Sequence, residues 1–356
     1  MISFLLLQNF RNYSSAQFKF KENTTFIIGP NSSGKTNILE AIFFLANGKS
    51  FRAEKDYQVI KFSEQTARVK GTSDQDTSLE IVIANKNNSR FTPLKRFLVN
   101  GVSKRRIDFM GNFQAVLFTP SDLDMITSSP SLRRSFLDNV LQQVDKRYRL
   151  ATISYSKALR QRNALLDKAK DTGFKNLKQF EYWDQLLIEE GVIITEAREK
   201  FITFINETQK EIFNFSIVYD KSVISKARLQ QYENEEIAAS VTLVGPHRDD
   251  LTFLMPDEKD SLHDLKYFGS RGQQRLAILQ LKELELLFLE KNNNKRPTFL
   301  LDDVFSELDN QHIKHISNVI NKQQTIITTT HKEFIPENLL SRVEVIKLKR
   351  SENGEI

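Results

Sequence analysis

The spacing of apolar and polar positions changes along the chain and predicts three regions. Up to about Leu123, short runs rich in β-branched and aromatic residues predict strands, among them the opening "MISFLLLQNFRNY", "TSLEIVIAN" and "RFLVNGVSKRR". Asn100-Gly101, inside the last of these, is a strong hairpin-turn signal. From Phe180, apolar positions recur in steps of three and four through Ile212, which predicts one long amphipathic helix.

The last region returns to alternating helix and strand. A dense helical pattern covers Gly272 to Lys291 and is followed by the predicted strand "TFLLDD", a helix, the strand "TIITTTH" and a terminal strand "VEVIKLKR". The pattern therefore predicts an α/β protein that is interrupted by a helical insertion.

A phosphate-binding loop is predicted between the first buried strand and the first helix. The string "GPNSSGKT" fits G-x-x-x-x-G-K-[ST], with apolar "FII" before it and a helical pattern after it. Backbone N–H groups and a helix N-terminus attract phosphates there, Lys35 reaches the terminal phosphates, and the Thr36 hydroxyl is a magnesium ligand. This motif alone does not separate ATPase, GTPase and kinase. The candidate nucleotide-binding residues are Gly29, Pro30, Asn31, Ser32, Ser33, Gly34, Lys35 and Thr36.

Two carboxylates follow a predicted buried strand in "TFLLDDVFSELD". A carboxylate at the end of such a strand lies beside the phosphate loop in nucleotide-binding α/β folds. Asp302 is therefore the candidate magnesium ligand, and Asp303 the candidate group that polarises a water near the γ-phosphate.

Two further motifs are weak when taken singly. In "FGSRGQQR", Ser270, Gly272 and Gln273 stand just before or at the start of a helix, where N–H donors suit an anion, although a flexible loop explains the string better when it is taken alone. His331 ends a predicted strand and could meet the γ-phosphate. Their order along the chain, after the phosphate loop and around the aspartates, makes both significant.

Composition indicates a globular protein with a polyanionic partner. The chain has 356 residues, of which 40% are hydrophobic and 27% charged, and no run approaches the length of a membrane span. It has no cysteine and no secretory leader, so we expect a cytoplasmic protein.

The basic residues are concentrated in two runs, although the net charge is only +6. The run from Arg133 to Lys170 holds ten basic and three acidic residues. A second run holds seven basic residues and no acidic one: Lys86, Arg90, Lys95, Arg96, Lys104, Arg105 and Arg106. Two such runs favour nucleic acid as the partner.

The order of these motifs is that of the ABC-type ATPases, and the chain resembles the RecF family of recombination and repair proteins, relatives of the structural-maintenance-of-chromosomes (SMC) ATPase heads. The resemblance covers nearly the whole length, and its specific strings are "SPSLRRSFLD" and "GPHRDD". The other strings that carry it are "NFRNY", "GKSFRAEKD", "FTPSDLDMITS", "SRGQQR" and "LLDDVFSELD".

The resemblance implies a P-loop ATPase with a helical second lobe inserted between the phosphate-loop and signature halves. The ATPase lobe would comprise residues 1–125 and 241–356, and the inserted lobe residues 126–240. ATP and Mg²⁺ would be the cofactors, with Lys35, Asp303 and His331 catalytic and Thr36 and Asp302 on the metal. Gln114 resembles the glutamine that senses magnesium. Ser270, Gly272 and Gln273 would form a signature loop that caps ATP on the opposite protomer, together with Ser306 to Asp309. Arg11 and Arg52 would approach nucleotide or DNA.

Three departures from the family pattern stand out. Ser32 replaces a common glycine, which we expect to be tolerated only if its backbone is not left-handed. Asp303 replaces the glutamate usual in transporters and suggests slow hydrolysis. Ser128 replaces a glycine in a turn.

The function implied by the resemblance is ATP-dependent dimerisation and clamping on DNA, with weak DNA-stimulated hydrolysis and RecO and RecR as partners. The DNA would be duplex, gapped or a single-strand/duplex junction. The alternative is an ABC-type ATPase of transport or chromosome maintenance. A transporter fits poorly because 235 residues separate Lys35 from Ser270, and a long coiled coil finds no room. A nuclease would need a metal-binding domain in the 25 residues after His331.

Overall fold

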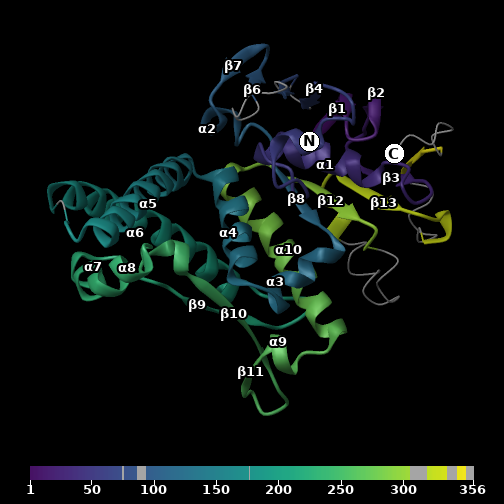
Figure 1. Ribbon diagram of the computed structural model, residues 1–356. Coiled ribbons are helices and arrows are strands. Elements are labelled where there is room, and N and C mark those ends of the chain that lie inside the picture. Colours follow the sequence, from purple (N-terminus) through teal and green to yellow (C-terminus); the bar gives the residue numbers. More distant parts are fainter. Residues whose placement is uncertain (74–75, 86–93, 176, 305–318, 335–342, 350–356) are drawn as a thin grey trace. The chain divides into compact units, whose positions relative to one another are not determined.

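The computed structural model describes residues 1–73, 76–85, 94–175, 177–304, 319–334 and 343–349 (Figure 1). The chain divides into two compact units. Unit 1 comprises Met1–Asp122 and Ile278–Ile356, and unit 2 comprises Leu123–Ala277. Among the described residues, no helix combines the length and apolar character needed to cross a bilayer.

Unit 1 contains a parallel sheet in the order β14-β3-β13-β12-β8. Its strands are β3 (Thr24–Ile28), β8 (Ala115–Phe118), β12 (Thr298–Asp302), β13 (Thr325–Thr329) and β14 (Glu344–Lys347). Their apolar runs are buried almost throughout in all strands but β14, as expected for a sheet covered on both faces. The three strands predicted at the end of the chain are confirmed, and all carboxyl ends share one edge of the sheet.

The second sheet of unit 1 is antiparallel, in the order β2-β1-β4-β5-β6-β7. Its strands are β1 (Ile2–Phe10), β2 (Tyr13–Lys19), β4 (Thr66–Ser73), β5 (Ser78–Ala84), β6 (Leu94–Val99) and β7 (Val102–Lys104). Asn100 and Gly101, with φ of 49° and 77°, join β6 to β7 where Val99 pairs with Val102, so the predicted hairpin is confirmed. Short helical turns in this unit are η1 (Asp56–Val59), α2 (Arg106–Phe109), η2 (Pro120–Leu123, which ends one residue into unit 2) and η5 (Lys332–Phe334).

Helix α1 (Lys35–Asn47) lies between the two sheets of unit 1. Its apolar residues share one core with Leu5 and Leu7 of β1 and with Leu300 of β12. A helix that is buried on all sides must be apolar on all sides, and after Lys35 its only charged residue is Glu40. The phosphate loop is thus anchored to a helix that is buried in the core of the unit.

Unit 2 is built on long helices. These are α4 (Pro130–Val144), α5 (Lys146–Thr172) and α6 (Leu177–Glu207), and α5 and α6 run side by side as a hairpin (Figure 1). The predicted long helix is confirmed as α6, although it ends at Glu207, before Ile212. Shorter helices are α3 (Asp124–Thr127), α7 (Lys226–Gln231), α8 (Glu233–Ala239), η3 (Pro246–Arg248) and α9 (Leu265–Phe268).

Unit 2 also contains an antiparallel sheet, β11-β10-β9, that the sequence pattern did not predict. Strand β9 (Ser216–Asp220) pairs with β10 (Asp250–Pro256), and β10 with β11 (Leu262–Asp264). The boundary of unit 2 therefore falls after Ala277, inside helix α10 (Arg271–Asn293), rather than after residue 240. The other boundary, predicted after residue 125, falls after Asp122.

The two family-specific strings meet in the core of unit 2. Arg133 binds both oxygens of Asp250, at 2.6 and 3.0 Å, and Arg198 of α6 pairs with Asp249 at 2.8 Å. Ser128 has φ −101°, so its position does not require glycine. Burial lowers the pKa of His247 to about 4. The neutral ring accepts a hydrogen bond from the Tyr155 hydroxyl and donates one to the Thr242 carbonyl.

Candidate nucleotide-binding site

Both glycines of the predicted phosphate loop are sterically required. The loop joins β3 to α1. At Gly34, with φ 95°, a Cβ would lie 2.6 Å from the Tyr13 hydroxyl and 2.8 Å from the Asn12 amide. At Gly29 it would lie 2.7 Å from Ser33 Oγ and 3.0 Å from the Leu348 carbonyl. The loop is therefore packed too tightly for any side chain at these positions.

The loop presents donors suited to phosphate. Within the described chain, the N–H groups of Gly34, Lys35 and Thr36 donate to no carbonyl, as is usual at a helix N-terminus. Lys35 is buried, and its Nζ donates to the carbonyls of Gly29 and Pro30 at 2.7 and 2.9 Å. The pKa of Lys35 is lowered from its ordinary value, because the effect of burial exceeds the opposing effect of the Asp303 and Asp302 carboxylates. Ser33 Oγ is buried with no hydrogen-bond partner among the described residues. These features fit a nucleotide phosphate.

Ser32 departs from our expectation. We expected a backbone that is not left-handed at this position, but its φ is 66°. The expectation was wrong because the loop turns sharply enough to need a left-handed residue here, and serine adopts that conformation at a cost of about 1–2 kcal/mol. Asn31 and Ser32 are both exposed.

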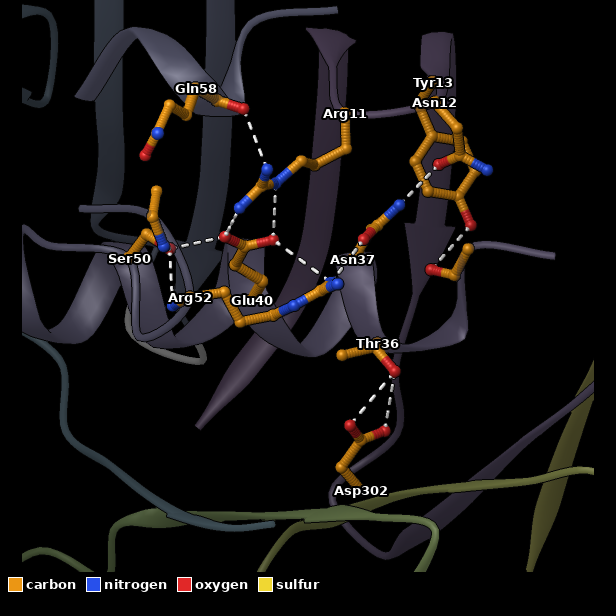
Figure 2. Close-up of polar contacts among 12 residues, drawn as sticks. Arg11, Asn12, Tyr13, Thr36, Asn37, Glu40, Ser50, Arg52, Gln58 and Asp302 are labelled. Carbon is orange, nitrogen blue, oxygen red and sulfur yellow. Dashed lines mark hydrogen bonds and ion pairs between the residues drawn. The ribbon is translucent and has the colours of Figure 1, made fainter. Parts of the chain in front are cut away.

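Thr36 and Asp302 are brought together, as predicted for two ligands of one metal ion. Thr36 Oγ1 lies 3.0 Å from both carboxylate oxygens of Asp302 (Figure 2). Thr328, at the end of β13, donates to Asp302 Oδ1 at 2.6 Å and fixes the carboxylate from the other side. The hydroxyl and carboxylate oxygens suit Mg²⁺. Sequence reasoning missed Thr328, although it also stands at the carboxyl end of a buried strand.

Asp303 follows at the same edge of the sheet. Its backbone is left-handed, with φ 52°, and its N–H lies 3.0 Å from Thr328 Oγ1 and 3.2 Å from the Thr328 carbonyl. Because Asp303 raises the pKa of Lys35, its carboxylate lies within electrostatic range of the phosphate loop. The role of Asp303 near the terminal phosphate stays a prediction.

Gln114 lies at the edge of the sheet opposite to Asp302, where the parallel strands begin. It precedes β8, whose first residue, Ala115, pairs with Thr298, four residues before Asp302. At roughly 3.3 Å per residue, Gln114 is more than about 13 Å from the level of Asp302. The prediction that Gln114 binds magnesium or nucleotide is therefore wrong.

Thr119 follows β8 at the edge of the sheet where Asp302 lies, and sequence reasoning did not select it. It is buried, its N–H donates to Asp122 Oδ2 at 2.6 Å, and its hydroxyl lies 2.9 Å from Ser121 Oγ. The signal was the polar "TPSD" directly after the strand "AVLF".

The remaining predicted residues are placed separately. His331 follows β13 at the same edge as Asp302 and is exposed. Ser306 to Asp309 lie outside the described residues. Ser270, Gly272 and Gln273 belong to unit 2, at the start of α10.

Ser270 and Gln273 form a capping box. The Gln273 N–H donates to Ser270 Oγ at 3.2 Å, and the Ser270 N–H donates to Gln273 Oε1 at 2.8 Å. Gly272 is exposed, and a Cβ there would meet nothing closer than Ser270 Oγ at 3.8 Å. Glycine in a helix costs about 1 kcal/mol relative to alanine. Nothing within the described part of the chain therefore requires glycine here.

A buried ion pair supports the phosphate-loop helix. Glu40, one turn after Thr36, is fully buried and accepts from Arg11 at 2.8 and 2.5 Å and from Ser50 at 2.5 Å (Figure 2). Arg52 is half-exposed, 3.8 Å from Glu40, and donates to Asn37 at 3.0 Å. The Arg11 side chain thus helps to hold the helix in place, and its predicted approach to nucleotide or DNA stays a prediction.

Comparison with known proteins agrees with this geometry. The family model described as the RecF/RecN/SMC N-terminal domain matches residues 1–355. The DNA replication and repair protein RecF of Lachnoclostridium phytofermentans is 36% identical over 365 residues, which cover 98% of each chain. The chain belongs to the RecF family. RecF of Halalkalibacterium halodurans is 35% identical, with 97% of each chain covered.

A solved structure extends the match to three dimensions. The recombination mediator RecF with ATP, of the RecFOR pathway, is 31% identical and has a TM-score of 0.83, with 94% of this chain and 93% of that one covered. The predicted resemblance to the RecF family and the α/β ATPase fold are thus confirmed over the full length.

Proposed function

We propose that the chain binds ATP with Mg²⁺ at the loop from Gly29 to Thr36. The observation that carries this proposal is the pairing of Thr36 with Asp302, at 3.0 Å, directly beside the free N–H groups of the loop. Mg²⁺ bound there would neutralise phosphate charge. The RecF structure with ATP supports the same nucleotide.

The ATP is shared between two copies of the chain. The signature residues Ser270 and Gly272 are exposed at a helix start, and glycine at position 272 has no purpose within the described chain. It leaves room for another molecule to approach the helix N-terminus closely, and the γ-phosphate of an ATP bound to a second copy is such a group. Because nucleotide then contacts both copies only in the closed pair, ATP shifts the population toward the dimer.

Hydrolysis is slow and releases the pair. Asp303 accepts a proton from the attacking water as the water oxygen bonds to the γ-phosphorus. The bond between the γ-phosphorus and the β,γ-bridging oxygen breaks, its electron pair leaves with ADP, and phosphate is released. His331 contacts the γ-phosphate and Lys35 neutralises its charge. The aspartate side chain is one methylene shorter than glutamate, which makes its contact with the water less direct.

The closed pair holds DNA in recombination and repair, with RecO and RecR as partners. Unit 2 carries the basic run from Arg133 to Lys170. Arg133, Arg149 and Arg162 of this run are buried, but its exposed cations on α5 include Lys157, Arg160, Lys168 and Lys170. The relatives of the chain are DNA replication and repair proteins. These exposed cations are available to phosphates.

Fluorescence anisotropy with duplex DNA, with and without ATP at two salt concentrations, tests this function. Closing two copies on one DNA should tighten binding by about 10²-fold. Affinity should fall about tenfold or more between about 50 and 200 mM salt. Lys35→Ala should lose the ATP effect. Equal binding by the wild-type protein in all four conditions would exclude the clamp.

A further inference from the structure

The two family-specific strings border a groove in unit 2 that the nucleotide site does not use. The groove, of about 300 Å³, lies between α4, α5, α6 and η3. We call it the Arg134 groove. Its lining on α4 and α5 comprises Ser131, Arg134, Ser135 and Asp138 of α4 and Thr152, Tyr155, Ser156 and Leu159 of α5.

Arg134 carries donors that the protein does not satisfy. In the part of the chain that the structure describes, this side chain makes one hydrogen bond, from Nη1 to the Asp249 carbonyl at 2.8 Å. Arginine has five N–H donors, so Nε and Nη2 remain available to a ligand. Burial is the main cause that lowers the pKa of Arg134; Arg198 and Arg248 lower it further, whereas Asp250 and Asp249 raise it.

The carboxylates around the groove are already engaged. Asp250 is bound at both oxygens by Arg133, and Asp249 is paired with Arg198. Asp138, in the groove wall, accepts from the Tyr148 hydroxyl at 2.5 Å and from Arg198 at 2.9 Å. Within the described residues, Arg134 therefore forms no ion pair of its own with these carboxylates, and neither does Arg248, whose guanidinium donates to the Thr242 carbonyl.

Hydroxyls and further cations surround Arg134. Ser135 and Ser156 are exposed in the groove lining. Lys157 and Arg160, each next to a lining residue in the sequence, are exposed on α5, and Lys168 follows on the same face. The exposed Asp167, two turns after Arg160, also lies on this face, where the cations outnumber it. At 1.5 Å per residue, these cations extend over about 16 Å of the helix. A row of cations of that length matches a phosphodiester backbone better than a single anionic side chain.

We propose that the Arg134 groove binds a backbone phosphate of DNA, with the guanidinium and the serine hydroxyls donating to its oxygens and α5 following the strand. This inference rests on the proposed DNA-binding function and assigns it a site. The site lies wholly within unit 2, so it requires no particular arrangement of the two units. Arg134 would be a positioning contact, since phosphates carry no sequence information.

The test compares Arg134→Gln with Lys226→Gln, an exposed cation on α7 that gives the same change of charge. Binding of duplex DNA is measured by anisotropy across a salt series. For Arg134→Gln, the slope of log affinity against log salt should become shallower by about one per chain, while Lys226→Gln should keep the wild-type slope. A wild-type slope in Arg134→Gln would overturn the proposal.

A second pair of variants avoids the bond to Asp249. Ser135→Asp and Ser135→Asn differ only in charge at an exposed position of the groove. Ser135→Asp should bind DNA several-fold more weakly than Ser135→Asn at low salt, and equal affinities would contradict the site. If the wild-type protein itself shows no binding, the proposed function fails. If the wild-type protein binds DNA, but neither the salt slopes of the first pair nor the affinities of the second pair differ, only this inference fails.

Discussion

Replacing Asp303 with asparagine should slow ATP hydrolysis by about 10²–10⁴-fold, because the group that accepts the proton from water is lost. Asparagine tolerates the left-handed backbone at this position, where φ is 52°, so the loop should keep its shape. ATP binding should persist, because Thr36, Asp302 and Lys35 are unchanged. Single-turnover hydrolysis and equilibrium ATP binding measure the two effects separately.

The matched control is Asp302→Asn. This change removes a carboxylate that contacts Thr36 and Thr328, so it should weaken magnesium-dependent ATP binding itself. Undiminished hydrolysis in Asp303→Asn, or equal loss of ATP binding in the two variants, would contradict the separate roles of the two aspartates.

Replacing Glu40 with alanine should lower the free energy of unfolding by about 3–5 kcal/mol, because it leaves the charge of Arg11 without its partner inside the protein. Glu40 is fully buried, and the side chain of Arg11 is 21% exposed. Loss of the pair should also loosen α1 and reduce ATP affinity, since Thr36 stands one turn before Glu40. Urea unfolding followed by circular dichroism gives the change in stability.

Two variants show whether the buried pair is responsible. Arg52→Ala removes a half-exposed arginine of the same network and should cost less than about 1 kcal/mol. The double variant Arg11→Met with Glu40→Leu replaces the pair with apolar groups and should recover most of the lost stability. If Glu40→Ala unfolds at the same urea concentration as Arg52→Ala, Glu40 is not the support of the loop helix.

The parts of the site that depend on short spacing could be predicted from the sequence. The phosphate loop and Asp302 follow from one strand–loop–helix pattern and one strand end, and the structure brings Thr36 to Asp302. Glu40 and Arg11 could not be paired in this way, because they are 29 positions apart and only the packing of α1 against the β1–β2 turn makes them neighbours.

The errors had similar physical causes. Gln114 was chosen by its resemblance to a family glutamine, although it precedes β8, and the rule that identified Asp302 would have selected Thr119. Strand β9 was missed because it lies between helices, and 29 residues separate its end at Asp220 from the start of its partner β10 at Asp250. The left-handed backbone of Ser32 depends on the local turn, which the residue type does not reveal.

The claim that one ATP is held between two copies of the chain can be tested by cross-linking. The chain has no cysteine, so Asn31→Cys in one copy and Arg271→Cys in the other introduce the only two thiols, both at exposed positions beside the phosphate loop and the signature loop. The copies are mixed in an Asp303→Asn background and treated with a short bis-maleimide, with Lys226→Cys replacing Arg271→Cys as the control. A cross-linked dimer that forms only with ATP, and only with the Arg271→Cys partner, is the result we predict. A yield that ATP does not change, or that equals the Lys226→Cys control, would contradict it.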